Sequence, residues 1–592
     1  MAKAGTFRTQ NFFVLQSRRL FLIAVLAALA LGSVLRIAWL TADPPTHATV
    51  GIVWHDEGPW VHNARNRVLW GIWRTDEWNP VFIAPVFTAL EFAAFSAFGV
   101  GTWQARTVPV LSGLAAIILL GAGLTAVAGR RAGIIGAVLL ATNYVFVMWN
   151  RAALMESTMT SLIVASWAAY ALAARRPATG LLAGSAVVLA LFTKASAVFF
   201  VAAIGIDAAF TIVSAAWSSL RNRLGLPAPA AETVRAAWWT LAGVGIAAGL
   251  VGLLFVLPHW SEYRFYNWQM SVTRKPSYTL RALLDRASWL PIAHDFFTRM
   301  WLVTSVAALA VVSIAARWRR ALPAERLLVL WLAIGLLELI VHDSGNERRY
   351  VMFVPALVAL AALVLGREGP VLSTSRPLDA RARWLAIPLL LALSYLVIGS
   401  LVRLAFLYDI GPGVRLAAGL SIGFVALVFW RWRAVTSWLE RQHVPQTAAL
   451  VIVALAVAAD LAQYWQWASN RTTRNHDASV ALGRELPSGT LVHGKLANGL
   501  SLENEIKPVF VGRGFGNYAD RKGRDDVRYI LTYIAPRIGY EGSIIKDVLE
   551  AYPNRAIVRT FDVAETPSGH DKAALIDKFG GDPGGRTGRA QH

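Results

Sequence analysis

The stretch HDEGPWVHNARNRVLWGIW (residues 55–73) follows the first long apolar run of the chain. Two adjacent carboxylates, Asp56 and Glu57, stand directly before the turn-forming pair Gly58-Pro59. Such a pair can serve as a general base and a supporting acceptor, although an acidic pair in a loop is more often simply solvated. Apolar residues at helical spacing follow, and they predict an amphipathic helix that lies on the membrane and holds the acidic pair at the interface. These residues are Trp60, Ala64, Val68 and Ile72.

On both sides of this stretch the chain is strongly apolar. Of its 592 residues 56% are hydrophobic and only 16% are charged, with a mean hydropathy of +0.48. Soluble proteins have about 25% charged residues, and each helix that crosses a bilayer needs about 20 apolar residues. The sequence therefore predicts an integral membrane protein. It contains no Cys, which excludes disulfides, thiolate metal sites and a Cys nucleophile.

Thirteen apolar ranges predict an all-α membrane domain. The ranges are 20–40, 107–128, 132–149, 157–174, 179–193, 196–216, 236–257, 299–316, 326–341, 350–366, 384–406, 414–430 and 446–466. No Ala-x-Ala cleavage site follows the first range, so we expect it to be a retained span and not a signal peptide.

Basic residues predict the orientation, because short cytoplasmic connections carry an excess of Arg and Lys. Clusters between alternate pairs of ranges are Arg130/Arg131, Arg175/Arg176, Arg221/Arg223, Arg317/Arg319/Arg320, Arg381/Arg383 and Arg431/Arg433. We expect these clusters and the N-terminus to be cytoplasmic. From Arg471 onward there are only 18 basic against 15 acidic residues, a balance of +3, so most of the net charge of +21 belongs to the membrane part and does not indicate a nucleic-acid partner.

The apolar run 81–99 would invert this orientation if it crossed the membrane. It contains Pro85 and Glu91, and we expect it to form an interfacial or re-entrant helix on the outer face. The chain then divides into a transmembrane catalytic domain (1–466), with outer loops at 41–106 and 258–298, and a small extracytoplasmic α/β domain (467–592). Predicted strands in the latter are 490–493, 527–534 and 556–563, and about 12 final residues have a disordered composition.

Further ionisable residues occur at the outer ends of predicted spans, where each has two readings. Arg151 and Glu156 form either an interfacial ion pair or part of a site. Lys194 is a lone cation within about 35 mostly apolar residues, and it either snorkels to the surface or binds a phosphate. Arg348 and Arg349 suit phosphate recognition, or they anchor and orient the following span.

Motifs for metals and nucleotides are missing: there is no P-loop, no HExxH and no His/Asp cluster at metal spacing. His55 and His62 are seven residues apart and could face together, but with one Asp they make only a weak metal site. We expect no required cofactor, with a divalent metal as the less favoured alternative.

In this order, the pieces resemble the C-type (GT-C) glycosyltransferase superfamily, and in particular the branch of aminoarabinose (lipid A) transferases and protein O-mannosyltransferases. The resemblance covers about residues 18–360. It departs from the family pattern at Glu156, where the family usually has Asp, and at Asn79-Pro80, where it has paired Pro. The matching residues are Asp56, Glu57, Trp60, Ala64, Arg65, Gly71, Trp73, Pro80, Pro85, Phe98, Gly99, Arg106, Arg151, Leu154, Glu156, Lys194, Arg349, Tyr350 and Pro355.

The resemblance implies a GT-C-like fold and a sugar donor linked to polyprenyl phosphate. It also implies inverting transfer at the extracytoplasmic face of the plasma membrane, and it leaves open whether the hydroxyl acceptor is a lipid, a glycan or a protein. We expect Asp56 to be the general base, with Glu57 as the alternative, and Glu156 to orient the acceptor or Asp56. The residues assigned to substrate or carrier-phosphate binding are Lys194, Arg348, Arg349, Tyr350, His55 and Arg65.

Three other functions remain open at this point. A glycan polymerase or ligase that uses a lipid diphosphate would tend to have a large Arg-rich outer loop late in the chain, and the loop 258–298 is modest. A transporter usually shows inverted repeats and helices broken near the midplane, whereas the polar residues here gather at the outer ends of spans. The third alternative is an inactive scaffold with the same fold.

Overall fold

Long apolar segments form helices because lipid offers no hydrogen-bond partner to an open backbone. The structure, a computed structural model, describes residues 3–46, 50–217, 228–270, 279–285, 299–342, 347–367, 382–405, 410–441, 444–512, 517–535, 538 and 543–580. Each of the thirteen predicted ranges coincides with helix in these residues. The helices are α1 (Lys3–Ile37), α5 (Thr102–Ala128), α6 (Arg130–Thr142), α7 (Tyr144–Trp149), α8 (Met155–Ala173), α9 (Thr179–Thr193), α10 (Val198–Ala216), α12 (Ala231–Val251), α16 (Trp301–Ala316), α17 (Pro323–His342), α18 (Val354–Leu365), α19 (Ala382–Ala405), α20 (Ile410–Trp430) and α22 (Gln446–Ser469).

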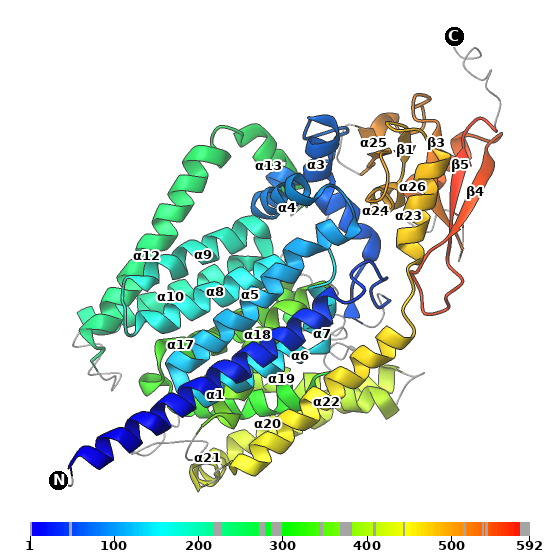
Figure 1. The fold of residues 1–592 in the computed structure, drawn as a ribbon. Coiled ribbons are helices and arrows are strands. Elements are labelled where there is room, and N and C mark those ends of the chain that lie inside the picture. Colours follow the sequence, from blue (N-terminus) through cyan, green and yellow to red (C-terminus); the bar gives the residue numbers. More distant parts are fainter. Residues whose placement is uncertain are drawn as a thin grey trace.

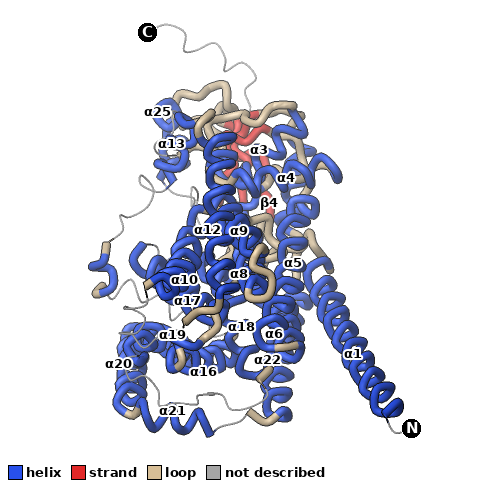
Figure 2. Tube along the Cα trace, turned by 90° about the vertical axis from the view of Figure 1, so that its left-hand side faces the viewer, coloured by secondary structure: helices blue, strands red, loops and turns tan. Residues whose placement is uncertain are grey.

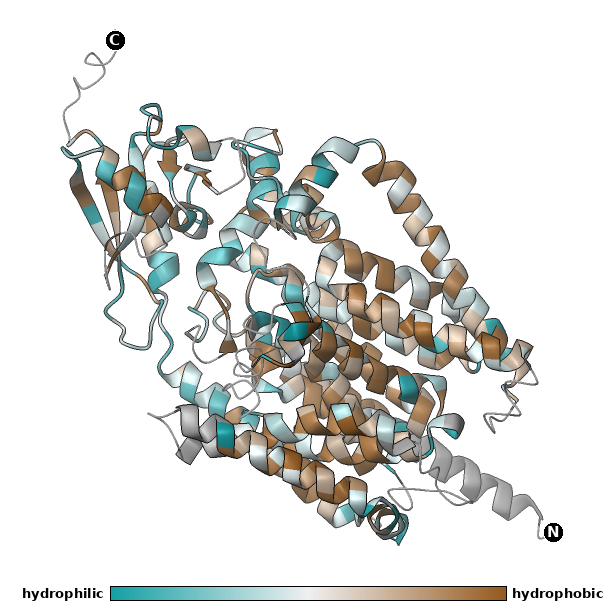
Figure 3. Ribbon diagram, turned by 180° about the vertical axis from the view of Figure 1, so that it is seen from behind, coloured by the Kyte–Doolittle hydropathy of each residue, from teal (hydrophilic) through white to brown (hydrophobic). Residues whose placement is uncertain are grey.

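These helices make the protein a multi-span membrane protein. Within the described residues, five helices are long and apolar enough to cross a membrane, or six if the pair Arg415–Trp430 and Trp432–Arg441, bent by 79°, counts as one span. Large apolar side chains stay exposed on the outer helices, for example Leu254 at 74% and Leu450 at 63%. Figure 3 shows hydrophobic residues along the bundle and more hydrophilic ones over the C-terminal region. An exposed apolar belt of this kind fits a lipid environment.

The bundle ends in a layer of shorter elements on the side of the C-terminal region. Helices α3 (Glu57–Trp70), α4 (Pro85–Phe98) and α13 (Trp260–Trp268) lie there, whereas the N-terminus and α21 (Trp432–Arg441) lie at the other end (Figures 1 and 2). With 14 residues and about 1.5 Å per residue, α4 is about 21 Å long. It is therefore shorter than the bilayer core of ~30 Å.

The amphipathic helix predicted after the acidic pair is present as α3, and most of it is covered by other parts of the protein. Ten of its 14 residues are buried, including the polar His62, Asn63, Arg65 and Asn66. Asn63 accepts a hydrogen bond from the Val81 amide (3.1 Å), and Arg65 bonds to the C-terminal region. Because polar side chains on several faces find protein partners, α3 is buried between α4 and the C-terminal region.

The C-terminal region is a small mixed sheet with short helices. Its elements are α23 (Arg474–Glu485), β1 (Leu491–His493), α24 (Lys495–Gly499), β2 (Lys507–Val509), α25 (Asn517–Asp520), β3 (Tyr529–Ala535), α26 (Ser543–Ala551), β4 (Ala556–Asp562) and β5 (Lys572–Asp577). The strand order is β2-β1-β3-β5-β4, with β1 parallel to β2 and β3, and β5 antiparallel to β3 and β4.

The three predicted strands are present as β1, β3 and β4, and the sequence reading missed β2 and β5. Strand β2 has three residues, one of them a Pro, which normally argues against a strand. Strand β5 lies inside the sheet with five consecutive buried residues, so it lacks the polar–apolar alternation that marks a half-buried strand. The final residues with a disordered composition lie outside the described residues, as do 271–278 and 286–298 of the predicted loop 258–298 and the basic residues Arg221, Arg223 and Arg381.

Candidate active site

Asp56 lines a cavity of about 330 Å³ between the helical bundle and the C-terminal region. Its walls combine aromatic side chains with ionisable ones, which is the usual make-up of a small-molecule site. The aromatic residues are Trp60, Trp78 and Phe510; the ionisable residues are Asp56, Lys194, Glu338, His342, Arg348, Arg349 and Lys495.

The local chain path presses Asp56 against the C-terminal region. Trp54–Asp56 form one 3-10 turn, and α3 begins at the next residue. A Cβ atom on Gly58 would lie 1.8 Å from the backbone oxygen of Asn498 in α24. Only glycine allows this approach, so the sequence Asp-Glu-Gly-Pro is what lets α24 pack directly on the acidic loop.

Asp56 is an ionised carboxylate held by two cations. Its Oδ2 accepts a hydrogen bond from the Arg348 guanidinium (2.5 Å), and its Oδ1 lies 2.5 Å from Lys495 Nζ. Burial by itself raises the pKa of Asp56, but Arg348, Lys495 and His55 outweigh burial and hold that pKa well below its usual range. Asp56 therefore stays negatively charged at neutral pH.

Glu57 has a different environment and does not belong to the residues that line the cavity. Its carboxylate accepts two hydrogen bonds from Arg106 (2.8 and 2.7 Å) and one from the Ala153 amide (2.6 Å). Arg106 also donates to the carbonyl oxygens of Leu40 and Ala42. This network ties the acidic loop to the end of α1 and the start of α5.

Glu156 and Lys194 form a buried ion pair of 2.5 Å, with side-chain exposures of 1% and 15%. Of the two readings of Arg151 and Glu156, the ion pair between them is not formed. Arg151 instead donates to carbonyl oxygens at the end of α1, including those of Leu35 (3.0 Å) and Ala38 (2.7 Å). Nor does Lys194 reach for the surface, because its ammonium lies over the cavity and faces a carboxylate.

Two arginines from the 3-10 turn before α18 (Glu347–Phe353) complete the cationic wall. Arg348 binds Asp56, and Arg349 donates to Glu338 in α17 (3.0 Å). Tyr350 is 1% exposed and packs against Phe353 beside the cavity, but it is not one of the lining residues.

His55 and Arg65 contact the C-terminal region and not the cavity. His55 Nδ1 lies 3.3 Å from Tyr533 Oη and 3.5 Å from Glu565 Oε2. Arg65 donates to three carbonyl oxygens in succession, those of Ser501 (3.0 Å), Asn504 (2.8 Å) and Ile506 (3.0 Å). These contacts hold the C-terminal region on the bundle.

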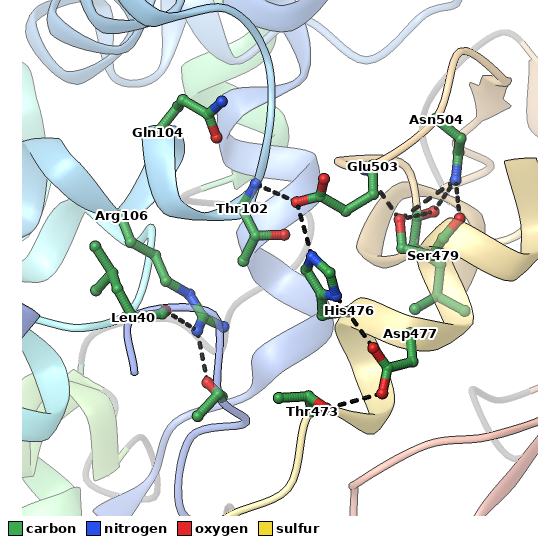
Figure 4. Close-up of polar contacts among 12 residues, drawn as sticks. Leu40, Thr102, Gln104, Arg106, Thr473, His476, Asp477, Ser479, Glu503 and Asn504 are labelled. Carbon is green, nitrogen blue, oxygen red and sulfur yellow. Dashed lines mark hydrogen bonds and ion pairs between the residues drawn. The ribbon is translucent and has the colours of Figure 1, made fainter. Parts of the chain in front are cut away.

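A second group of polar contacts fastens the same interface, and Figure 4 shows those around Glu503. The Thr102 amide at the start of α5 donates to Glu503 Oε1 (2.7 Å), and His476 Nε2 lies 3.7 Å from the same oxygen. Asp43 accepts from the Arg474 and Asn475 amides (2.8 and 3.1 Å). The C-terminal region, which forms one wall of the cavity, is therefore fastened to the helical bundle by several polar contacts.

The two histidines considered for a metal lie apart in different environments. His62 Nε2 is 3.3 Å from Asp76 Oδ1, whereas His55 faces Tyr533 and Glu565. Among the residues that the structure describes, no group of three or more His, Cys, Asp or Glu side chains could hold a metal ion.

The structure thus brings Asp56, Lys194, Arg348 and Arg349 together around one cavity, with Glu156 behind Lys194. Sequence reasoning missed Lys495 and Glu338. An acidic residue inside an apolar helix could have drawn attention to Glu338. Lys495 is one of 18 basic residues from Arg471 onward, and no local pattern distinguishes it from the others.

Comparison with solved structures identifies the fold. No protein-family model and no curated protein sequence matches the chain. By structure, the chain matches GT-C membrane glycosyltransferases across most of its length, so the resemblance seen in the sequence is confirmed for the fold. One of them is ArnT from Cupriavidus metallidurans in the apo state, which belongs to the aminoarabinose transferase branch. That match has a TM-score of 0.51 at 15% identity and covers 95% of this chain and 98% of ArnT.

Two further matches have lower TM-scores. ArnT from Cupriavidus metallidurans bound to undecaprenyl phosphate gives 0.49 at 16% identity, over 94% of this chain and 97% of that one. The oligosaccharyltransferase AglB from Archaeoglobus fulgidus, in complex with an inhibitory peptide and a dolichol-phosphate, gives 0.46 at 13% identity. That match covers 94% of this chain and 74% of AglB.

Proposed function

We propose that this protein transfers a sugar from a polyprenyl-phosphate carrier to a hydroxyl group of a lipid, glycan or protein acceptor, with inversion at the sugar carbon. The observation that carries the proposal is the cavity itself, in which a buried carboxylate, Asp56, faces basic side chains from three parts of the chain: Lys194, Arg348/Arg349 and Lys495. A carboxylate suits proton removal, and clustered cations suit a phosphate.

In the proposed reaction Asp56 removes a proton and the cations stabilise the departing phosphate. The acceptor oxygen attacks the anomeric carbon and loses its proton to Asp56. The bond from that carbon to the phosphate oxygen breaks, and its electron pair stays on the departing polyprenyl phosphate. Negative charge therefore grows on the phosphate in the transition state, and cations already placed beside it stabilise that state more than the ground state.

The test uses the purified protein in lipid nanodiscs, with undecaprenyl phosphate as the probe because ArnT has been solved with this lipid. We expect saturable binding of undecaprenyl phosphate and none of uncharged undecaprenol. Mass spectrometry of a deletion strain should show a polyprenyl-phosphate sugar accumulating and one glycan or lipid losing that sugar. Equal binding of the two lipids contradicts the proposal, and net movement of an unmodified solute across the bilayer supports a transporter instead.

We also propose thirteen spans within 1–466, a cytoplasmic N-terminus and an extracytoplasmic region 467–592 that closes the site. Helix α5 starts at Thr102, beside Glu503 of the C-terminal region, and ends at Ala128, about 40 Å away by its 27 residues. A second cavity of about 1050 Å³ at that far end is lined by Arg130, Arg131, Arg317 and Arg367. Gathered arginines at the end opposite the C-terminal region support the cytoplasmic assignment of that end.

Reporter fusions test this orientation. Alkaline phosphatase, which is active only outside the cytoplasm, should be active when fused after Asn470 and inactive when fused after Arg130 or Arg176. A fluorescent protein that folds only in the cytoplasm should give the opposite pattern. An odd number of the proposed spans separates Arg130 from Asn470, and the same is true of Arg176, so one span too many or too few reverses the pattern. A cytoplasmic reporter signal at Asn470 contradicts the proposed orientation and the interfacial assignment of 81–99.

A further inference from the structure

Lys495 is the cavity's contribution from the C-terminal region. Its Nζ lies 2.5 Å from Asp56 Oδ1, and the side chain lines the cavity together with Arg348 and Lys194. No other lysine or arginine of the C-terminal region lines this cavity among the described residues. The C-terminal region, which follows the last predicted span, therefore contributes a cation that contacts the candidate catalytic base.

The fold places this lysine firmly. Lys495 opens α24 directly after β1, and Gly494 between them has φ +119°, a conformation that favours glycine. The other end of α24 packs on the acidic loop, where Gly58 meets Asn498. Strand β1 lies between β2 and β3, so the turn leaves the sheet at the carboxyl ends of parallel strands, which is where such sheets commonly bind ligands.

Asp56 is poorly suited to proton removal in the arrangement observed. Both of its carboxylate oxygens are occupied, Oδ1 by Lys495 and Oδ2 by Arg348. These cations keep the pKa of Asp56 low, and a carboxylate with a low pKa is a weak base. An acceptor hydroxyl also has to find one of these oxygens available before it can donate its proton.

A phosphate group has the chemistry to change this arrangement. Its anionic oxygens form strong charge-assisted hydrogen bonds with Lys and Arg, and the nearest cations are those that hold Asp56. Lys194 and Arg349 also line the cavity, each facing a carboxylate of its own, Glu156 and Glu338 respectively. A phosphate that enters the cavity therefore competes with carboxylates for every basic side chain it meets.

We propose that Lys495 is a phosphate-binding residue of this site, and that the carrier phosphate takes Lys495 and Arg348 from Asp56, which frees the carboxylate to act as a base only when the carrier is bound. This inference rests on the proposed function and adds to it a residue and an order of events. In the empty site Asp56 is the shared anionic partner of Lys495 and Arg348. In the loaded site the phosphate takes this place, and Asp56 turns to the acceptor.

Binding measurements on Lys495 variants test the first half. We expect Lys495→Met to weaken undecaprenyl phosphate binding in nanodiscs about tenfold or more and Lys495→Arg to keep most of it. The matched control is Lys546→Met on α26, an exposed lysine of the same region at 68% exposure, which should bind like the wild type. Thermal unfolding of each variant distinguishes lost affinity from a detached C-terminal region. A normally stable Lys495→Met protein with wild-type affinity overturns the inference.

The second half of the proposal, the release of Asp56 by the phosphate, predicts that one substitution increases the affinity for the carrier. Asp56→Asn removes the carboxylate that competes for Arg348 and Lys495, so it should bind undecaprenyl phosphate about tenfold more tightly than the wild type. Weaker or unchanged binding in a stably folded Asp56→Asn protein contradicts the competition. These outcomes differ from failure of the proposed function itself, in which the wild-type protein would bind undecaprenyl phosphate no better than undecaprenol.

Discussion

Replacing Asp56 by Asn should abolish sugar transfer. A hydroxyl group is a poor nucleophile until its proton is being removed, and a positioned base typically contributes about 10²–10⁴-fold to the rate. Asn keeps the size and the hydrogen-bonding shape of Asp but cannot take up the proton. Turnover should therefore fall by about two to four orders of magnitude, measured with purified protein, a polyprenyl-phosphate sugar and the acceptor.

Glu57→Gln is the matched comparison for this variant. Glu57 is bound by Arg106 and the Ala153 amide, so its neutralisation leaves a buried guanidinium without its charge partner. We expect this variant to lose thermal stability, with transfer reduced only in proportion to the folded protein. An active Asp56→Asn protein beside an inactive, well-folded Glu57→Gln protein would move the role of base to Glu57. Activity in both would contradict the mechanism.

Replacing Lys194 by Met should lower turnover about 10²-fold or more. The ammonium group is proposed to stabilise charge on the departing phosphate, and removal of one such preorganised donor typically has an effect of this size. The measurement separates turnover from donor affinity, because a cation that acts mainly in the transition state changes turnover more than it changes binding.

The buried partner of Lys194 requires a control. Lys194→Met alone leaves Glu156, at 1% side-chain exposure, without its cation, and this could destabilise the protein by itself. The double variant Lys194→Met/Glu156→Gln removes both charges. If the lysine serves the phosphate, the double variant folds well and stays slow. Recovery of the wild-type rate in the double variant would show that Lys194 only neutralises Glu156.

Much of the fold is readable from the sequence. In lipid every backbone polar group has to bond within its own segment, so an apolar run of sufficient length has to be a helix, whatever surrounds it. The apolar ranges predicted all coincide with helix for that reason. Strands β2 and β5 were not predicted, because their extended structure depends on pairing with neighbours in the sheet and not on a local alternation of polar and apolar residues.

By itself, the sequence determined the multi-span helical class and drew attention to Asp56, Lys194, Arg348 and Arg349, because hydropathy and unusual charges are local properties; the GT-C-like fold followed from the resemblance to a known family. Only the tertiary structure decided that Asp56 and not Glu57 lines the cavity, that Arg65 holds the C-terminal region, and that Lys495 reaches the site. Asp56 and Arg348 are separated by 292 residues, and Lys495 follows still later in the chain. An ion pair between such distant residues leaves no trace in either local sequence, because it exists only once packing has brought the two charges into a shared, poorly hydrated cavity.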